Sequence, residues 1–238
     1  MKITFLAHSG FFVELQNLVL LFDWWKGELP ELPDGKPLLV LVSHHHPDHF
    51  SPTIFSLAQP GREVRFLLGK DIRLSPGKRK EWGVTEELME LCTRLGGGRH
   101  EGPFPGVVVE TMTSTDDGVA FLVTADGKTI YHAGDLNWWY WEGEPDPWNP
   151  EMERHYKEYT KPLQGRHIDL AMVPLDPRLG QPAEQFGLSY LLDIAQVDKV
   201  LPMHQWNDYS PTARFAKSFP QWADRLIPIS QEGQTFLL

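Results

Sequence analysis

The chain has 238 residues, of which 41% are hydrophobic and 23% charged, and this composition excludes a disordered protein. A formal net charge of −10 disfavours nucleic acid as a partner, because most of the surface would repel a phosphate backbone. A single cysteine excludes an intramolecular disulfide. Without an export signal or an apolar stretch of ~20 residues, we expect a cytoplasmic protein that contacts no membrane.

The first quarter of the chain predicts β-strands, because short aliphatic and aromatic runs are separated by turn residues. These predicted strands are residues 2–6, 11–15, 19–22, 38–43 and 64–68. Residues 51–57 predict a helix, since serine at the N-cap position precedes proline at the first helical position. Residues 85–95, which include Cys92, predict a second helix that three glycines would end.

The second half of the chain repeats this order of strands and then helices. Residues 106–112, 118–124 and 128–131 predict strands, the last two joined as a hairpin by the turn at 125–127. Residues 151–163 predict a charged surface helix, 168–174 a buried strand, 183–195 a helix and 200–203 a final strand. We therefore expect a single domain, residues 1–238, with two packed mixed β-sheets between outer helices in a four-layer αββα sandwich. Periodicity alone does not exclude another α+β topology.

A histidine-rich motif follows the most apolar predicted strand. Residues 38–42 are all aliphatic and lead into His44, His46, Asp48 and His49. In an extended segment His44 and His46 point to the same side, and the turn at Pro47 brings Asp48 and His49 back from another direction. Neutral imidazoles and carboxylates are the ligands of catalytic zinc, which keeps one coordination position for water. The motif predicts a metal site; the alternative is a solvated turn that binds metal adventitiously.

The motif His44-x-His46-x-Asp48-His49 after an apolar strand resembles the signature of the metallo-β-lactamase-fold superfamily, especially its lactonase-like and uncharacterised hydrolases. Residues 2–23, 129–135 and 201–204 resemble the family's opening strands, bridging-aspartate segment and last ligand segment. The resemblance implies one or two divalent ions, zinc or else manganese or iron. It assigns one ion to His44, His46 and Asp135, and the other to Asp48, His49, Asp135 and His204. A metal-bound hydroxide, oriented by Asp48 as the catalytic residue, would attack a small ester, lactone or phosphoester.

One ligand that the resemblance implies is missing from this chain. The family's third histidine falls within residues 110–117, which contain no histidine. Thr113 stands near its place but is a poor zinc ligand, whereas Asp116 offers an oxygen if its loop curls inward. His132 is a further candidate. These three replacements stay open.

Other residues are expected near the metal. For His8, a hydrogen-bonded turn histidine is the favoured interpretation, and Asp23 is expected to orient a ligand imidazole. Arg178 is expected either to bind a substrate anion or to pair with Asp176. An aromatic wall or ordinary core packing would explain the tryptophans that follow Asp23 and the expected ligands: Trp24, Trp25, Trp138, Trp139, Trp141 and Trp206.

The sequence leaves other functions open beside a hydrolase with a small-molecule substrate. A phosphodiesterase acting on nucleotides or nucleic acid would use the same centre, although the acidic charge disfavours nucleic acid. A non-catalytic metal-binding protein of the same fold could have lost turnover with the third histidine. Di-iron redox chemistry occurs in the wider superfamily, usually together with a flavin module, and we expect no such module in this chain.

Overall fold

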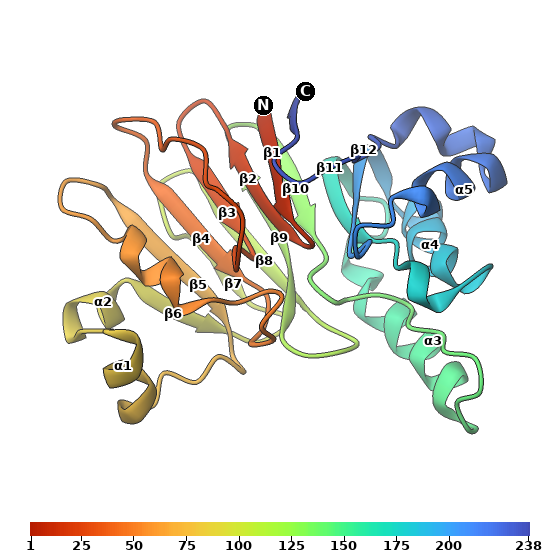
Figure 1. Ribbon diagram of the computed structural model, residues 1–238, viewed down its shortest axis with the longest axis horizontal. Coiled ribbons are helices and arrows are strands. Elements are labelled where there is room, and N and C mark those ends of the chain that lie inside the picture. The colour runs from red at the N-terminus through yellow and green to blue at the C-terminus, as the bar shows by residue number, and fades with distance from the viewer.

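The computed structural model describes residues 1–238 and contains two stacked β-sheets (Figure 1). The first sheet has seven strands in the order β13-β1-β2-β3-β4-β5-β6. Its strands are β1 (Lys2–Ala7), β2 (Gly10–Glu14), β3 (Val19–Phe22), β4 (Leu38–Val42), β5 (Val64–Gly69), β6 (Cys92–Leu95) and β13 (Thr235–Leu237). The second sheet has six strands in the order β12-β11-β10-β9-β8-β7. These are β7 (His100–Glu101), β8 (Val108–Thr113), β9 (Val119–Ala125), β10 (Lys128–His132), β11 (His167–Pro174) and β12 (Gln196–Met203).

Both sheets combine antiparallel and parallel pairs. Strands β3, β4, β5 and β6 run parallel in the first sheet, and β10, β11 and β12 run parallel in the second. The remaining neighbours are antiparallel. Because the carboxyl ends of parallel strands meet at one edge of a sheet, the loops that follow β4, β10 and β12 can gather their side chains in one place.

Helices cover the outer faces of both sheets. Figure 1 shows α1 (Pro76–Trp82) and α2 (Glu86–Glu90) beside the first sheet. On the far side, α3 (Trp148–Tyr159), α4 (Phe186–Ile194) and α5 (Ser210–Ser218) lie beside the second sheet. Short 3-10 helices occupy Pro52–Leu57, Lys161–Leu163, Pro177–Leu179, Ala183–Gln185 and Pro220–Arg225. The predicted four-layer αββα fold is confirmed. None of the helices combines the length and the apolar character needed to cross a bilayer.

Strand β4 is aliphatic throughout because both of its faces are buried. Leu39 and Leu41 belong to the large core between the sheets, whereas Leu38, Val40 and Val42 belong to the core between the first sheet and its helices. Alternate side chains of a strand point to opposite faces, so a strand covered on both sides reads as a continuous apolar run. This burial fixes the point from which the histidine motif departs.

Several predicted elements differ from the observed ones. Residues 85–95 do not form one helix, because α2 ends at Glu90 and Cys92–Leu95 forms β6, which pairs in parallel with β5. Residues 51–57 form a 3-10 helix in which Ser51 accepts a hydrogen bond from the amide of Thr53. The predicted helix 151–163 begins at Trp148 and ends at Tyr159. The sequence pattern did not predict α1, α5 or β13.

Candidate metal centre

Loops from both sheets bring the predicted ligands together. His44, His46, Asp48 and His49 follow β4 of the first sheet, whereas Asp135 follows β10 and His204 follows β12 of the second. Except for the half-buried Asp48 and the more exposed His46, these side chains are buried. The two sheets therefore contribute to one site at the carboxyl ends of their strands.

Asp135 lies between three of the histidines. One carboxylate oxygen, Oδ1, is 3.2 Å from Nε2 of His49 and 3.4 Å from Nε2 of His204. The other, Oδ2, is 3.5 Å from Nε2 of His44. Donors bound tetrahedrally at zinc distances of about 2.0–2.1 Å lie about 3.4 Å from one another. The two oxygens of Asp135 thus face two different groups of donors, as a bridging carboxylate does.

Each of these three histidines has its other ring nitrogen held by a hydrogen bond. Asp23 accepts from Nδ1 of His49 at 2.8 Å, and Asp176 accepts from Nδ1 of His204 at 2.7 Å. The hydroxyl of Ser43 donates to Asp23 at 2.6 Å, so its oxygen is free to accept from Nδ1 of His44 at 2.9 Å. This network leaves the three Nε2 atoms facing Asp135, and Nε2 of His44 also lies 3.0 Å from Nδ1 of His46. The predicted orienting role of Asp23 agrees with this geometry.

The protonation of the site depends on burial and on the charge of Asp135. Burial raises the pKa of Asp135, but its interactions with His49 and His204 outweigh that effect and lower the pKa well below the usual value. Burial lowers the pKa of His49, but the charge of Asp135 and hydrogen bonds to Asp135 and Asp23 outweigh that effect and raise the pKa well above the usual value, so His49 carries a proton that a bound metal ion would replace. Burial also lowers the pKa of His44 to about 3 and that of His8 to about 2, so both imidazoles are neutral at pH 7. A neutral imidazole is the form that binds a metal ion.

Several buried polar atoms of the site have no hydrogen-bond partner in the protein. They include Nε2 of His8, Nε2 of His49 and Oδ1 of Asp135. A buried polar atom without a partner costs roughly 1–3 kcal/mol, and a bound metal ion would remove that cost for several donors at once. The residues present therefore fit a divalent metal.

Asp116 is the candidate replacement that lies closest to the predicted first site. Its carboxylate groups with His46 and Asp135, with ligand atoms within 4.8 Å of one another. Thr113 is exposed, and its hydroxyl packs against Gly97 instead. Burial and the charge of Asp135 raise the pKa of Asp116, as expected for a carboxyl group beside another one. His46 also lies near Asp117, with 3.3 Å between Nε2 and Oδ2.

His132 is not placed as a ligand. Its Nε2 donates to the carbonyl of Ser9 at 2.8 Å, and its Nδ1 accepts from the amide of Gly134 at 3.1 Å. The ring stacks on Phe22 with centroids 5.0 Å apart. Since both ring nitrogens bind backbone groups, His132 joins the two sheets at the floor of the site without facing the donors.

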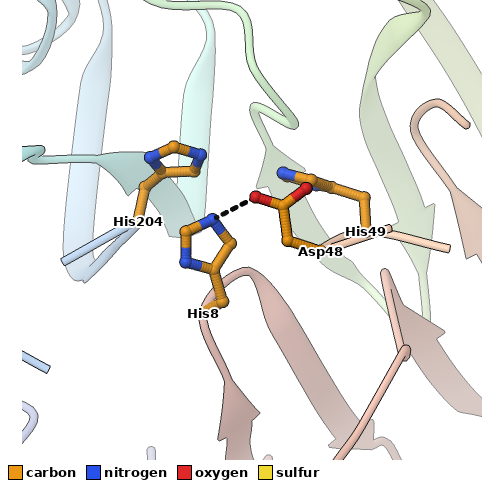
Figure 2. A group of neighbouring side chains, drawn as sticks. All are labelled: His8, Asp48, His49 and His204. Carbon is orange, nitrogen blue, oxygen red and sulfur yellow. Dashed lines mark ion pairs between the residues drawn. The ribbon is translucent and has the colours of Figure 1, made fainter. Parts of the chain in front are cut away.

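His8 lies inside the site. Figure 2 shows its imidazole converging with Asp48, His49 and His204, and the ligand atoms of these four residues lie within 4.8 Å of one another. The favoured interpretation of His8 as a hydrogen-bonded turn histidine missed this placement. The sequence signal was limited to its place between two predicted strands, residues 2–6 and 11–15, and the structure adds that its backbone there is left-handed, with φ of 53°.

An aromatic pocket of about 160 Å³ opens beside the centre. Its lining residues are Thr115, Asp116, Asp135, Trp139, Trp141, Trp148, Met152, Arg178 and His204. The predicted aromatic wall thus holds for Trp139 and Trp141, whereas Trp138 packs against Phe186 with ring centroids 5.2 Å apart. Trp25 and Trp206 line a neighbouring pocket together with His8.

Arg178 pairs with Asp176, which was one of its two expected roles. Nε of Arg178 lies 3.0 Å from both oxygens of Asp176, and its Nη2 lies 2.6 Å from Oδ2. The guanidinium lies over the ring of Trp206 at 4.5 Å. Burial raises the pKa of Asp176, but hydrogen bonds from His204 and Arg178 outweigh it and lower the pKa to about 2. Arg178 thereby keeps Asp176 ionised as the acceptor for His204.

Fold and site together define a metal-binding αββα protein. Residues 2–139 match the family described as the beta-lactamase superfamily domain. A UPF0173 metal-dependent hydrolase of Desulforamulus reducens is 33% identical over 98% of this chain and 98% of that protein. Another, from Carboxydothermus hydrogenoformans, is 31% identical where aligned, over 59% of this chain and 64% of that protein. The chain belongs to the β-lactamase superfamily, which confirms the resemblance seen in its sequence.

Solved structures show the same fold with different chemistry. A metallo-hydrolase of Ignicoccus hospitalis superposes with a TM-score of 0.62 at 18% identity, covering 100% of this chain and 98% of that one. The diiron β-hydroxylase CmlA of Streptomyces venezuelae gives 0.63 at 10% identity, covering 100% of this chain and 54% of that one. At these identities the likeness establishes the fold alone.

Proposed function

We propose that the protein is a metal-dependent hydrolase, with zinc as the expected metal, that acts on a small ester, lactone or phosphoester. The observation that carries the proposal is the meeting of three Nε2 atoms, from His44, His49 and His204, with the carboxylate of Asp135. A divalent ion bound among these donors would take the place of the proton that His49 shares with Asp135 in its absence. The names of the relatives as metal-dependent hydrolases support the reaction class.

The donors of this chain divide into two groups around Asp135. His44, His46 and Asp116 would hold one ion on the Oδ2 side, and Asp48, His49 and His204 would hold the other on the Oδ1 side. When bound, such ions lower the pKa of a coordinated water and polarise the oxygen atom of the bond to be hydrolysed. Asp48 is half-buried, so its carboxylate can both contact a donor group and accept a proton from water at the mouth of the site.

The aromatic pocket indicates the shape of the substrate. Trp139, Trp141, Trp148 and Met152 form an apolar wall next to Asp135 and His204, suited to an acyl chain or a flat ring. Asp116 adds an acidic group to the same pocket. Together with the net charge of −10, this acidity disfavours a polyanion such as nucleic acid. We therefore propose a small substrate with an apolar part.

The proposal is tested by measuring metal content and hydrolysis on the same preparations. The wild-type protein should contain between one and two zinc ions per chain by elemental analysis and hydrolyse members of a panel of esters, lactones and phosphoesters. Asp135→Asn should lose most of the metal and the turnover, because the shared carboxylate is gone. His167→Asn, at an exposed histidine paired with Asp198, should keep both.

Asp116→His tests the degenerate first site, because residue 116 lies beside His46 and Asp135 whereas Thr113 packs against Gly97. If Asp116 only partly replaces the missing histidine, this variant should raise the metal content towards two ions per chain. A wild-type protein that binds no metal would sink the proposal. Metal without hydrolysis of any ester, lactone or phosphoester would favour the non-catalytic metal-binding protein instead.

A further inference from the structure

We propose that His8 is a metal ligand, and that the ion beside Asp48 is held by His8, Asp48, His49 and His204. This inference rests on the proposed metal centre and adds to it a donor from the β1–β2 turn, outside the histidine motif. It also changes how the histidine ligands are distributed between the two sites. The first site lacks one histidine, whereas the second site would have an additional one.

The separation of the donors supports coordination. Nε2 of His8 lies 3.4 Å from Oδ2 of Asp48, which is the spacing of two ligands on one tetrahedral zinc ion, about 3.4 Å. The ring of His8 lies 4.0 Å from the ring of His204 and 5.5 Å from that of His49, measured between centroids. Figure 2 shows the four groups pointing at a common volume.

The chemistry of His8 also points to a missing partner. The residue is only 9% exposed, and its buried Nε2 makes no hydrogen bond within the protein. An imidazole buried for packing alone would bind a backbone or side-chain group with each nitrogen that faces the protein, as His132 does. The nitrogen of His8 instead faces a carboxylate and two other imidazoles, which are metal donors themselves.

The backbone holds His8 in this orientation. His8 and His204 both have left-handed backbones, with φ of 53° and 63°, and the amide of His204 donates to the carbonyl of His8 at 3.1 Å. Trp206 packs against the His8 ring with centroids 4.5 Å apart. Non-glycine residues in this conformation are costly and cluster at functional sites. The first turn of the chain and the loop after β12 are thus locked together around the donors.

The proposal predicts two ions of unequal affinity. The second site would have two carboxylates, of Asp48 and Asp135, and three imidazoles to draw on. The first would have two imidazoles and the exposed carboxylate of Asp116 beside the shared Asp135. On titration with a chelator, one ion should leave readily and the other should stay until the chelator is much stronger.

His8→Gln and His8→Glu test the ligand role as a matched pair. Both side chains reach about as far as the imidazole nitrogen, and both bear the same backbone penalty at this φ. Glutamate offers an anionic oxygen ligand, whereas glutamine offers a weak one and a hydrogen-bond donor. If His8 is a ligand, the affinity for the tightly bound zinc should fall on the order of 100-fold in His8→Gln, and much less in His8→Glu.

The opposite order would overturn the proposal. If His8 only donates a hydrogen bond to Asp48, glutamine should serve better than glutamate, whose charge would repel Asp48. X-ray absorption on wild-type protein loaded with one zinc per chain gives a second measurement that needs no variant. Three imidazoles per zinc are expected with His8 as a ligand, and two without it. A wild-type protein that binds no zinc would defeat the proposed function itself, whereas bound zinc with two imidazoles would defeat only this inference.

Discussion

Gly118 lies directly before β9 and against the backbone of the histidine motif. Its φ is +70°, and a Cβ added there would lie 2.0 Å from the carbonyl oxygen of Ser43 and 2.6 Å from Cβ of His44. The same carbonyl accepts a hydrogen bond from the amide of Val119 at 3.0 Å. The first ligand is therefore held in place by close contact between the backbones of the two sheets.

Gly118→Ala should disturb the metal site as well as the fold. We expect it to lower the free energy of unfolding by roughly 3–5 kcal/mol and to reduce metal content, because Ser43 and His44 must move aside. Gly127→Ala is the matched control, since Gly127 has nearly the same φ, +69°, with nothing within 4 Å of the added Cβ. That control should cost about 1–2 kcal/mol and leave metal content unchanged. If urea denaturation gave the same loss in free energy of unfolding for both variants, the contact between residue 118 and Ser43 would not contribute to stability.

The convergence of the motif residues could be predicted from sequence because they follow the end of a buried strand. That Asp135 and His204 join them was implied by the family resemblance of their segments. The placements of His8 and Asp116 were not predictable in the same way. Each depends on how a loop of one sheet packs against the other sheet, and local sequence patterns do not predict such a tertiary contact.

At the scale of elements, tertiary pairing explains most of the differences from prediction. Cys92–Leu95 has no strong strand pattern, but it completes the edge of the first sheet beside β5. Helix α1 has no buried residue and so lacks the apolar periodicity that predicts a helix. Strand β13 has three residues and pairs with β1. The strands lining the core were predictable, since burial on one or both faces determines their composition.

The position of Cys92 on β6 leads to a prediction about thiol reactivity. Burial raises the pKa of Cys92 to about 11, and its thiol donates to the carbonyl of Leu88 at 3.2 Å. Because the thiolate is the reactive form, native protein at pH 8 should react with a disulfide reagent on the order of 100-fold more slowly than protein unfolded in urea. Cys92 is the only cysteine, so the signal is unambiguous. Equal rates would mean that β6 opens readily.

At the scale of the whole molecule, the candidate metal centre joins two separately built halves. His8, His44 and His49 come from loops of the first sheet, and Asp135 and His204 come from loops of the second. Apart from this centre, the two sheets pack against each other through a large apolar core. A bound ion would add strong bonds across this interface, at its polar edge.

Metal removal should therefore lower thermal stability. At an ion concentration 1,000 times its Kd the folded state gains about 4 kcal/mol, which corresponds to roughly 10 °C in Tm for a domain of this size. Calorimetry of wild-type protein with and without a chelator measures the shift, and Asp135→Asn should show almost none. An equal shift in Asp135→Asn would locate the stabilising ion elsewhere, for example at the exposed group of His45, His46 and Asp117.

The indole rings around His204 give the protein a built-in optical reporter. Trp139 lies 5.4 Å and Trp206 lies 5.6 Å from the His204 ring, between centroids, and Trp206 also lies against His8. A paramagnetic ion such as Co²⁺ bound at these histidines would quench the fluorescence of both indoles at short range. Emission could then follow filling and emptying of the site in real time, without any label. Trp206→Phe would separate the contribution of the exposed indole from that of the buried one.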